Sequence, residues 1–580
     1  MRLDTYRNRY KCRRPEEVIK TCTETLERLG YIIEILEQPA GVGGMHSVHV
    51  VLKTKDDVLI AYSNGKGADR NLAMASGLAE TVERIFTQLN PKSIMRRDFL
   101  YNIDIPFLYD FRERYVDLEE IVLNPNEVIS KFSGEDPYLF SFLAKSYKKD
   151  GKIVCVEYNN VDESKDSILL PFEVMRGLNG SNGYCAGSTK EEALVQGISE
   201  LLERYIQLLM IEEDRNMLDS IGVIDRNSIC VTDSVRKTIS DIESKGNYTV
   251  TILDLTMNGK YPVAGLLLVD KTKQIAKLNI GAFPDYRIAI ERCFTEILQN
   301  STLDTWNGHP ISTEINKNSN KEALVTNGYG RYAYEIFGID RVSKENKYTQ
   351  LLNINENSNN ITFLEELKEI ISRDNTSVYY YDCSFTENFH VYIVVSPLYS
   401  YVFKSEIREL EFKEIEEEYT VDFRNISNEK LIQMFNSHIE YLTDSGVRML
   451  YLLEPGCKLF GKTVLDQDTA YASQYVLAIL ALKLNLVDLA ETFFSKVEFN
   501  EEMFDLVYLE RLRTIIKLKK LGLYDILEKL IDDKSFLDMN KPVTELLRTW
   551  GVEVYDDNHK DLLKTLRRNL LLSQAEFTNH

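Results

Sequence analysis

Two stretches of the 580-residue sequence carry acidic and basic residues at matched positions. Residues 67–84 read GADRNLAMASGLAETVER, and residues 187–204 read GSTKEEALVQGISELLER, 120 positions later and without a gap. The register pairs two glutamates and an arginine, namely Glu80 with Glu200, Glu83 with Glu203 and Arg84 with Arg204. Carboxylates are ligands for hard divalent cations, and arginine is a good partner for phosphate. A match of this length indicates a duplicated structural unit that carries a charged site.

Each stretch predicts a helix on which small residues and glutamates share one face. Residues three and four positions apart lie on the same side of a helix. The shared face consists of Ala73, Gly77, Glu80 and Arg84 in the first helix and of Ala193, Gly197, Glu200 and Arg204 in the second. On an ordinary surface helix the carboxylates point away from the small residues. Here the face that can be approached closely also carries the carboxylates.

A third and more divergent copy is predicted at residues 289–300, AIERCFTEILQN. With a shift of 96 positions Ala289 aligns with Ala193 and Glu296 with Glu200, whereas a glutamine replaces the second glutamate. This copy would bring one more arginine, Arg292, and one more carboxylate, Glu296, to the same centre.

Five carboxylates cannot share one pocket without compensation, because like charges a few ångströms apart repel strongly. Either neighbouring arginines or divalent cations can compensate the negative charge of these carboxylates. Oxygen ligands without cysteine or histidine select Mg²⁺ or Ca²⁺, and Mg²⁺ usually combines a few carboxylates with phosphate oxygens, which points to a nucleotide. Arg204 and Arg292 would then contact phosphates that the metals do not cover. The alternative is a solvated or salt-bridged helix face, which a single motif of this kind usually forms.

The surrounding pattern predicts alternating strands and helices up to about residue 400. We expect strands at 31–37, 48–52, 58–62, 153–158, 250–255, 263–269, 275–280, 378–383 and 391–395, and helices at 16–30, 232–247 and 363–373. Residues 63–67 are expected to form a glycine turn between a strand and the first repeat helix. They lack the spacing of a Walker loop.

Helical patterns dominate the rest of the chain. They lie at 427–443, 467–498, 501–520 and 523–533, and the pair at 470–483 and 486–497 resembles a TPR hairpin. We therefore predict a mixed α/β domain over residues 1–425, containing the internal pseudo-repeat, and an all-α, TPR-like domain over residues 426–580.

Charge and composition exclude several classes of protein. The net charge of −21 argues against a general nucleic-acid binder, which needs a basic face. No stretch reaches about 18 uninterrupted apolar residues, so no transmembrane helix is expected. The eight cysteines are scattered without a CxxC pair, as is typical of reduced thiols in the cytoplasm.

Three motifs resemble those of the YcaO-domain family, in order, within a similarity that covers roughly residues 8–400. They are NGKGADRNLAMASGLAETVER, SNGYCAGSTKEEALVQGISELLERY and AIERCFTEILQ. The resemblance implies a domain that binds ATP and Mg²⁺ without a Walker motif. It also implies an enzyme that phosphorylates the oxygen of a peptide amide, after which a side chain or a sulfide attacks the activated carbon and phosphate leaves. Azolines or thioamides result.

The resemblance also assigns roles to residues. It implies Mg²⁺ ligands at Glu80, Glu83, Glu200, Glu203 and Glu296, the first four of which, with Arg204, form the catalytic group. It implies nucleotide contacts from Lys11, Ser188, Glu192, Gln196, Arg204 and Arg292. The chain departs from the family pattern at three positions: Val18, where a hydroxyl residue is common, Cys185, where a small hydroxyl is common, and Ser188, where asparagine is common.

The helical tail and the length are similar to those of stand-alone family members that act as accessory factors in β-methylthiolation of a small-subunit ribosomal protein. The resemblance thus implies ATP and a protein or peptide substrate as partners, with a radical-SAM or sulfur-donor protein, and a cytoplasmic homodimer without direct contact to membrane or nucleic acid. The alternatives are a thioamide- or azoline-forming peptide enzyme and a non-catalytic ATP-binding scaffold. The absence of proline after Pro542 argues against a stand-alone azoline-forming enzyme.

Overall fold

The structure is a computed structural model. It describes residues 11–37, 46–55, 59–67, 69–87, 109–135, 148–149, 152–172, 175, 181–211, 215–297, 303, 309–310, 358–400, 426–442, 458–459, 462–463, 469–497, 505–531, 533–553 and 565–573.

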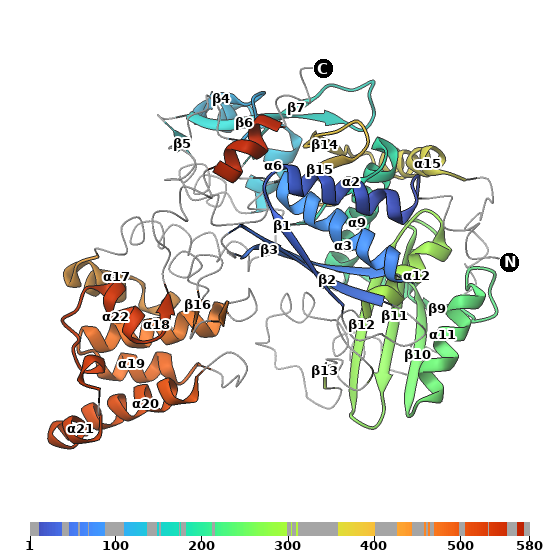
Figure 1. Cartoon of the computed structure of the whole chain (residues 1–580). Helices are drawn as coiled ribbons and strands as arrows, with labels where there is room; N and C mark the ends of the chain where they lie inside the picture. Colours follow the sequence, from blue (N-terminus) through green and yellow to red (C-terminus); the bar gives the residue numbers. More distant parts are fainter. Residues whose placement is uncertain are drawn as a thin grey trace.

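The first layer consists of a three-stranded antiparallel sheet and two helices (Figure 1). Its elements are α2 (Pro15–Arg28), β1 (Ile32–Glu37), β2 (His46–Lys53), β3 (Leu59–Gly67) and α3 (Arg70–Phe86). The predicted helix, strand and hairpin of this region are confirmed. Asp69 caps α3, since its side chain accepts a hydrogen bond from the amide of Leu72.

The turn predicted at residues 63–67 is wrong, because β3 continues through Gly67. The glycines serve close packing instead. A Cβ atom on Gly65 would lie 2.0 Å from the carbonyl oxygen of Ala73, and one on Gly67 would lie 2.6 Å from the amide nitrogen of Ala73. Only glycine allows the strand to approach the backbone of α3 this closely.

A seven-stranded antiparallel sheet with the strand order β4-β6-β14-β15-β8 forms the second layer, and β5 and β7 pair with β6. The strands are β4 (Arg114–Asp117), β5 (Lys148–Lys149), β6 (Lys152–Asn160), β7 (Ile168–Pro171), β8 (Tyr184–Gly187), β14 (Tyr379–Asp382) and β15 (His390–Val395). Helices α5 (Leu118–Leu123) and α6 (Glu127–Glu135) follow β4, and the long helix α9 (Lys190–Ile211) follows β8 and packs on β8 and β15.

A five-stranded antiparallel sheet completes the α/β region, with the order β13-β12-β11-β10-β9. Its strands are β9 (Gly222–Val223), β10 (Tyr248–Asp254), β11 (Val263–Asp270), β12 (Ile275–Ala282) and β13 (His309–Pro310). The accompanying helices are α10 (Arg215–Ser220), α11 (Asp233–Ser244), α12 (Tyr286–Ile297) and α15 (Asn360–Arg373). Figure 1 shows α11 beside β10 and α12 beside β12 and β11.

The structure supports the third copy of the repeat. In each copy a strand leads into a helix, as β3 into α3, β8 into α9 and β12 into α12. The first turn has the same backbone hydrogen bond each time: Ala73 to Asp69 at 3.0 Å, Ala193 to Thr189 at 3.1 Å and Ala289 to Asp285 at 3.2 Å. These residues are related by the shifts of 120 and 96 positions that the sequence predicts.

The contact between strand and helix is filled differently in each copy. The facing residues are Gly65 and Gly77 in the first, Cys185 and Gly197 in the second, and Gly281 and Cys293 in the third. A Cβ atom on Gly197 would lie 2.7 Å from the sulfur of Cys185, and one on Gly281 would lie 3.1 Å from the sulfur of Cys293. The cysteine thus lies on the strand in the second copy and on the helix in the third copy.

The C-terminal helices form a hydrophobic core of their own and gather at one end of the molecule (Figure 1). They are α17 (Asn428–Leu442), α18 (Thr469–Lys483), α19 (Val487–Phe494), α20 (Leu506–Lys520), α21 (Tyr524–Leu530) and α22 (Val543–Thr549). The predicted helices are confirmed, but the prediction of an all-α region is wrong, because β16 (Lys458–Leu459), β17 (Lys462–Thr463) and β18 (Val552–Glu553) form a small sheet. Two-residue strands are too short for a periodic sequence pattern. The likeness to TPR stays a prediction.

Residues 565–573 are helical and pack on the N-terminal layer rather than on the C-terminal helices. Leu566 and Leu570 belong to the hydrophobic core that also contains β2, β3 and α3. Arg567 is buried, and its guanidinium lies 5.9 Å from the ring centre of Tyr109. The predicted boundary near residue 425 falls outside the described residues. No helix that the structure describes is long and apolar enough to span a bilayer.

Replacement of Gly65 by alanine should destabilise the protein strongly. The new methyl group would overlap backbone atoms of α3, and such overpacking costs about 3 kcal/mol or more. Gly246→Ala is the control, because its Cβ would meet nothing closer than 3.4 Å. Chemical unfolding should show a large loss of stability for Gly65→Ala and a change of less than about 1 kcal/mol for Gly246→Ala. Equal effects would contradict the role of the close contact.

The exchanged cysteine leads to a second prediction. Gly197→Cys alone should destabilise the protein by about 1–3 kcal/mol, because two sulfur atoms cannot share the contact. The double variant Cys185→Gly/Gly197→Cys reproduces the arrangement of the third copy and should recover much of the loss. Unfolding of both variants and of Cys185→Gly alone gives the coupling energy. Additive effects would show that the two positions do not compensate.

Candidate functional site

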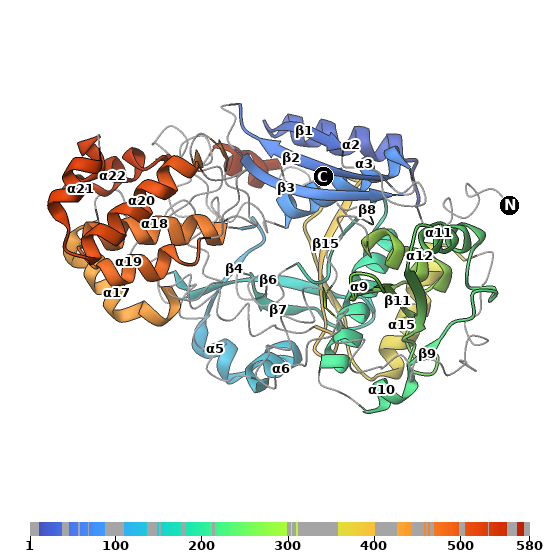
Figure 2. The same ribbon diagram turned by 90° about the horizontal axis from the view of Figure 1, so that it is seen from below.

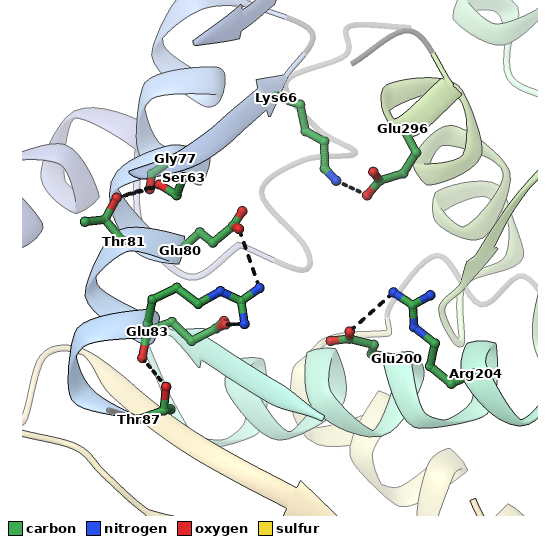
Figure 3. A network of polar contacts seen from close by, with 11 residues as sticks. Ser63, Lys66, Gly77, Glu80, Thr81, Glu83, Thr87, Glu200, Arg204 and Glu296 are labelled. Atoms are coloured by element: carbon green, nitrogen blue, oxygen red, sulfur yellow. Dashed lines mark hydrogen bonds and ion pairs between the residues drawn. The ribbon is translucent and has the colours of Figure 1, made fainter. Parts of the chain in front are cut away.

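The repeated helices direct charged side chains toward one region (Figure 3). Glu80 and Glu83 come from α3, Glu200 from α9 and Glu296 from α12, while Lys66 extends from β3. The contacts between strand and helix described above fix the rotation of each helix about its axis. The face with the small residues packs against the strand, and the glutamates one turn further along the helix lie at the edge of this contact. The structure therefore brings four of the predicted carboxylates, Glu80, Glu83, Glu200 and Glu296, into one region.

Arg84 holds both glutamates of α3. Its Nη2 lies 3.5 Å from Glu80 and its Nη1 lies 3.4 Å from Glu83. The side chains of Arg84 and Glu83 are only 19% and 12% exposed, so this pair is poorly solvated. Burial raises the pKa of Glu83 to about 8, against the lowering effect of Arg84, and the charges of Glu80 and Glu200 raise it further.

The raised pKa of Glu83 has a consequence for stability. The folded protein binds a proton at this group that the unfolded chain has already lost, so the group's contribution to stability decreases as the pH rises toward about 8. A cation bound beside the carboxylate would remove this penalty.

Helix α9 repeats the arrangement with weaker contacts. Arg204 Nη2 lies 3.8 Å from Glu200, and Nη1 donates a hydrogen bond to Gln207 at 3.0 Å. Burial raises the pKa of Glu200, and Arg204 opposes this effect. The charges of Arg84 and Glu203 also act on Glu200, so the two helices share one electrostatic environment.

Lys66 is a site residue that the sequence reasoning missed. Its ammonium forms an ion pair with the carboxylate of Glu296, across 230 positions of the chain. Burial lowers the pKa of Lys66 to about 8, although Glu80 opposes this shift. The missed signal is the lysine between the two glycines of GKG, since residues 186 and 282 at the equivalent positions of the other copies are alanines.

The residues expected to contact a nucleotide form two groups. In the first, Glu192 accepts hydrogen bonds from Lys11 Nζ at 3.1 Å, from the amide of Cys12 at 3.1 Å and from the amide of Ser188 at 3.4 Å. These contacts tie the N-terminal segment to the first turn of α9. A carboxylate with this many donors is already well satisfied.

In the second group, Arg292 donates hydrogen bonds to Gln196 at 3.1 Å and to the carbonyl oxygen of Ala282 at 3.2 Å. Together the two groups lie along α9 and α12. The structure thus gathers Lys11 with Ser188 and Glu192, and Gln196 with Arg292, while their contacts with a nucleotide stay predictions.

The departures from the family pattern have structural explanations. Val18 packs against the N-terminal hydrophobic core. Cys185 is fully buried, and its thiol donates a weak hydrogen bond to the carbonyl oxygen of Tyr392 at 3.6 Å. Cys185 is thus part of the contact between β8 and α9. The backbone amide of Ser188, which any residue except proline would supply, is the group that contacts Glu192.

The donor set fits Mg²⁺ in its chemistry but is not arranged in advance. Only carboxylate oxygens are offered by the described glutamates, as a hard cation requires. Yet among the described residues no group of three or more acidic, histidine or cysteine side chains is positioned to hold a metal ion. The ion pairs with Arg84, Arg204 and Lys66 account for this, because each basic group takes a carboxylate that a metal would need.

The part of the chain that carries this site matches a known protein family. Residues 64–400 match the family model of the YcaO cyclodehydratases, which is described as ATP- and Mg²⁺-binding. The matched range begins in β3 and includes all three repeat helices. ATP and Mg²⁺, expected from the sequence, are therefore the cofactors of the family.

Two curated relatives match part of the chain. An uncharacterized protein of Haemophilus influenzae is 30% identical over 302 residues, which cover 50% of this chain and 48% of the relative. The ribosomal protein S12 methylthiotransferase accessory factor YcaO of Escherichia coli is 26% identical over 336 residues, which cover 56% of each chain. The chain therefore spans about half the length of the curated relatives it matches.

Solved structures resemble the chain more distantly. A heterocyclase in complex with substrate and cofactor has a TM-score of 0.46 and 18% identity, covering 67% of this chain and 52% of its own. YcaO from Methanopyrus kandleri, bound with AMPPCP and Mg²⁺, has a TM-score of 0.42 and 17% identity, covering 67% and 93%. Both TM-scores lie below 0.5, so the family assignment depends on the family model and not on these likenesses.

Glu83→Gln should weaken binding of Mg²⁺-ATP by at least about tenfold, because mutation even of a residue that only supports a metal ligand typically costs about 10–100-fold in metal affinity. Glu119→Gln is the control, since Glu119 is an exposed glutamate at the start of α5. Calorimetric titration of both variants with a non-hydrolysable ATP analogue and Mg²⁺ measures the effect. Unchanged affinity in Glu83→Gln would remove α3 from the site.

Proposed function

The chain belongs to the YcaO family, and we propose that it uses ATP and Mg²⁺ to phosphorylate the oxygen of a protein or peptide amide. The observation that carries this proposal is the meeting of acidic and basic side chains from α3, α9 and α12 beside β3 (Figure 3). A triphosphate with its cations is a ligand that needs both kinds of charge in one place.

The glutamates of the three helices would hold the metal ions in this reaction. They are Glu80, Glu83, Glu200, Glu203 and Glu296. Bound Mg²⁺ supplies positive charge beside the phosphates, which favours transfer of the terminal phosphoryl group. These glutamate side chains are only partly exposed, and a bound substrate that covered them would exclude water, strengthen the ionic contacts and protect an activated amide from hydrolysis.

Basic side chains would orient the nucleotide. Arg204 and Arg292 offer guanidinium groups that suit phosphate oxygens, and Gln196 holds Arg292 in place. The cluster of Lys11, Ser188 and Glu192 would contact the nucleotide at the N-terminus of α9, where the backbone amides of the helix favour negative charge. The amide oxygen attacks the terminal phosphorus, ADP leaves, and the phosphate departs later when a nucleophile attacks the amide carbon.

For the biological role we propose an accessory factor in β-methylthiolation of a ribosomal protein. The supporting observation is the similarity to the accessory factor of Escherichia coli over 336 residues. In this role the protein would act as a cytoplasmic homodimer with a radical-SAM or sulfur-donor partner. The helices α17 to α22 have a separate core, and we propose that they present a TPR-like surface to such a partner.

The family description favours a second candidate, an enzyme that forms thioamides or azolines in a peptide. It shares the first chemical step, and only the substrate and the nucleophile differ. Incubation with ribosomal protein S12 and with short peptides separates the two roles. Activation of ATP turnover by S12 supports the accessory factor, whereas activation only by peptides supports the peptide enzyme.

Oxygen labelling tests the shared chemical step. A substrate with ¹⁸O in its amide carbonyl should transfer that oxygen to the released phosphate, which mass spectrometry detects as a two-dalton increase. Glu200→Gln should lower the rate at least about 100-fold, because it removes charge stabilisation at the phosphates. Glu119→Gln should react like the wild type. Phosphate whose new oxygen comes from water would contradict amide phosphorylation, and no ATP turnover with either substrate would favour a scaffold.

A further inference from the structure

The charges at the site are almost balanced by the protein's own side chains. Five carboxylates face four basic groups. Arg84 and Arg204 follow the glutamates of their own helices along the chain, whereas Arg292 precedes Glu296. The acidic set is Glu80, Glu83, Glu200, Glu203 and Glu296, and the basic set is Lys66, Arg84, Arg204 and Arg292. A divalent cation that entered without an anion would leave a partly buried basic group without its partner, which is unfavourable.

Lys66 differs from the arginines in where it comes from and what it holds. It extends from β3 and forms an ion pair with Glu296 on α12, so it joins the first copy of the repeat to the third (Figure 3). The two side chains are 26% and 34% exposed. The charges of Glu80, Glu203 and Glu200 also act on the ammonium, and that of Arg292 opposes them.

The equivalent positions in the other copies show that this lysine is not needed for the repeat itself. Residues 186 and 282 are alanines, and both strands still pack on their helices. The lysine therefore has a role at the charged centre, where a positive charge lies among carboxylates that three helices contribute.

We infer that the Lys66 ammonium serves as a stand-in cation for Glu296 and moves to a phosphate oxygen when the nucleotide binds with its metal. The inference deepens the proposed function and depends on it. Because the displaced ammonium needs a new anion, and the triphosphate supplies one, metal and nucleotide bind cooperatively. Metal alone binds weakly, since it must displace Lys66 from Glu296 without compensation.

The absence of a ready metal site supports this inference. Among the described residues, no three ligand side chains are gathered for a metal ion, although the carboxylates come from adjacent helices. In this state Glu80 and Glu83 are paired with Arg84, Glu200 with Arg204 and Glu296 with Lys66. Release of those pairs by phosphate would free the same carboxylates for coordination.

Metal binding without nucleotide is the decisive measurement. In the wild type, Mn²⁺ measured by electron paramagnetic resonance should bind at least about tenfold more weakly alone than with a non-hydrolysable ATP analogue. In Lys66→Met, Mn²⁺ alone should bind about tenfold more tightly than in the wild type, and the analogue should bind more weakly. Lys66→Arg keeps the charge and should resemble the wild type.

Lys53→Met is a matched control. Lys53 lies on the neighbouring strand β2, is 27% exposed and forms an ion pair at 2.8 Å with Glu34 of β1, which is not one of the glutamates of the site. This variant should bind Mn²⁺ and the analogue like the wild type. Equal effects of Lys53→Met and Lys66→Met would overturn the inference.

These measurements distinguish a failure of the proposed nucleotide site from a failure of the proposed role of Lys66. If the wild type binds no analogue with or without metal, the nucleotide site is contradicted. If the analogue binds but Lys66→Met leaves the affinity for Mn²⁺ alone unchanged, only the role of Lys66 is wrong. If Lys66→Met does not fold, the test uses the affinity of the wild type for Mn²⁺ with and without the analogue. Equal affinities in the two measurements would overturn cooperative binding.

Discussion

Close contact between a strand and the helix that follows it is the constraint on which the site depends. In each of the three copies a glycine on the strand or on the helix lets the two elements touch at distances that a larger residue would block. The contact fixes how each helix is rotated about its axis. Since the glutamates lie one turn beyond the small residues, their direction follows from packing alone, and no separate device is needed to aim them.

The buried charges depend in turn on one another. Glu83 and Glu200 are carboxylates whose ionised forms are destabilised by burial, and Arg84 and Arg204 only partly offset this cost. A site of this kind sacrifices folding stability for affinity toward a ligand that carries both signs of charge. The internal ion pairs allow the protein to fold before that ligand arrives, and they are weak enough to be exchanged for it.

Much of this arrangement could be predicted because the repeat is visible in the sequence as matching residue types. The matched positions of Glu80 and Glu200 identified the helices and the shared face, and the β-rich runs identified most strands. The extended course of β3 was missed, since glycines signal turns locally and their close packing on α3 is a tertiary effect. Lys66 was missed for the same reason, because its partner lies 230 positions away. The two-residue strands of the C-terminal region carry no periodicity that a sequence could reveal.

The helix at residues 565–573 ties the N-terminal layer to a late part of the chain. Leu566 and Leu570 complete a core whose other members begin at Cys22, and a leucine methyl of Leu566 would meet a side chain added at Gly30. During synthesis on the ribosome, the first layer must therefore wait with an open apolar surface until the last of these residues has emerged. Such long-range closure slows folding and leaves time for chaperones to act on the nascent protein.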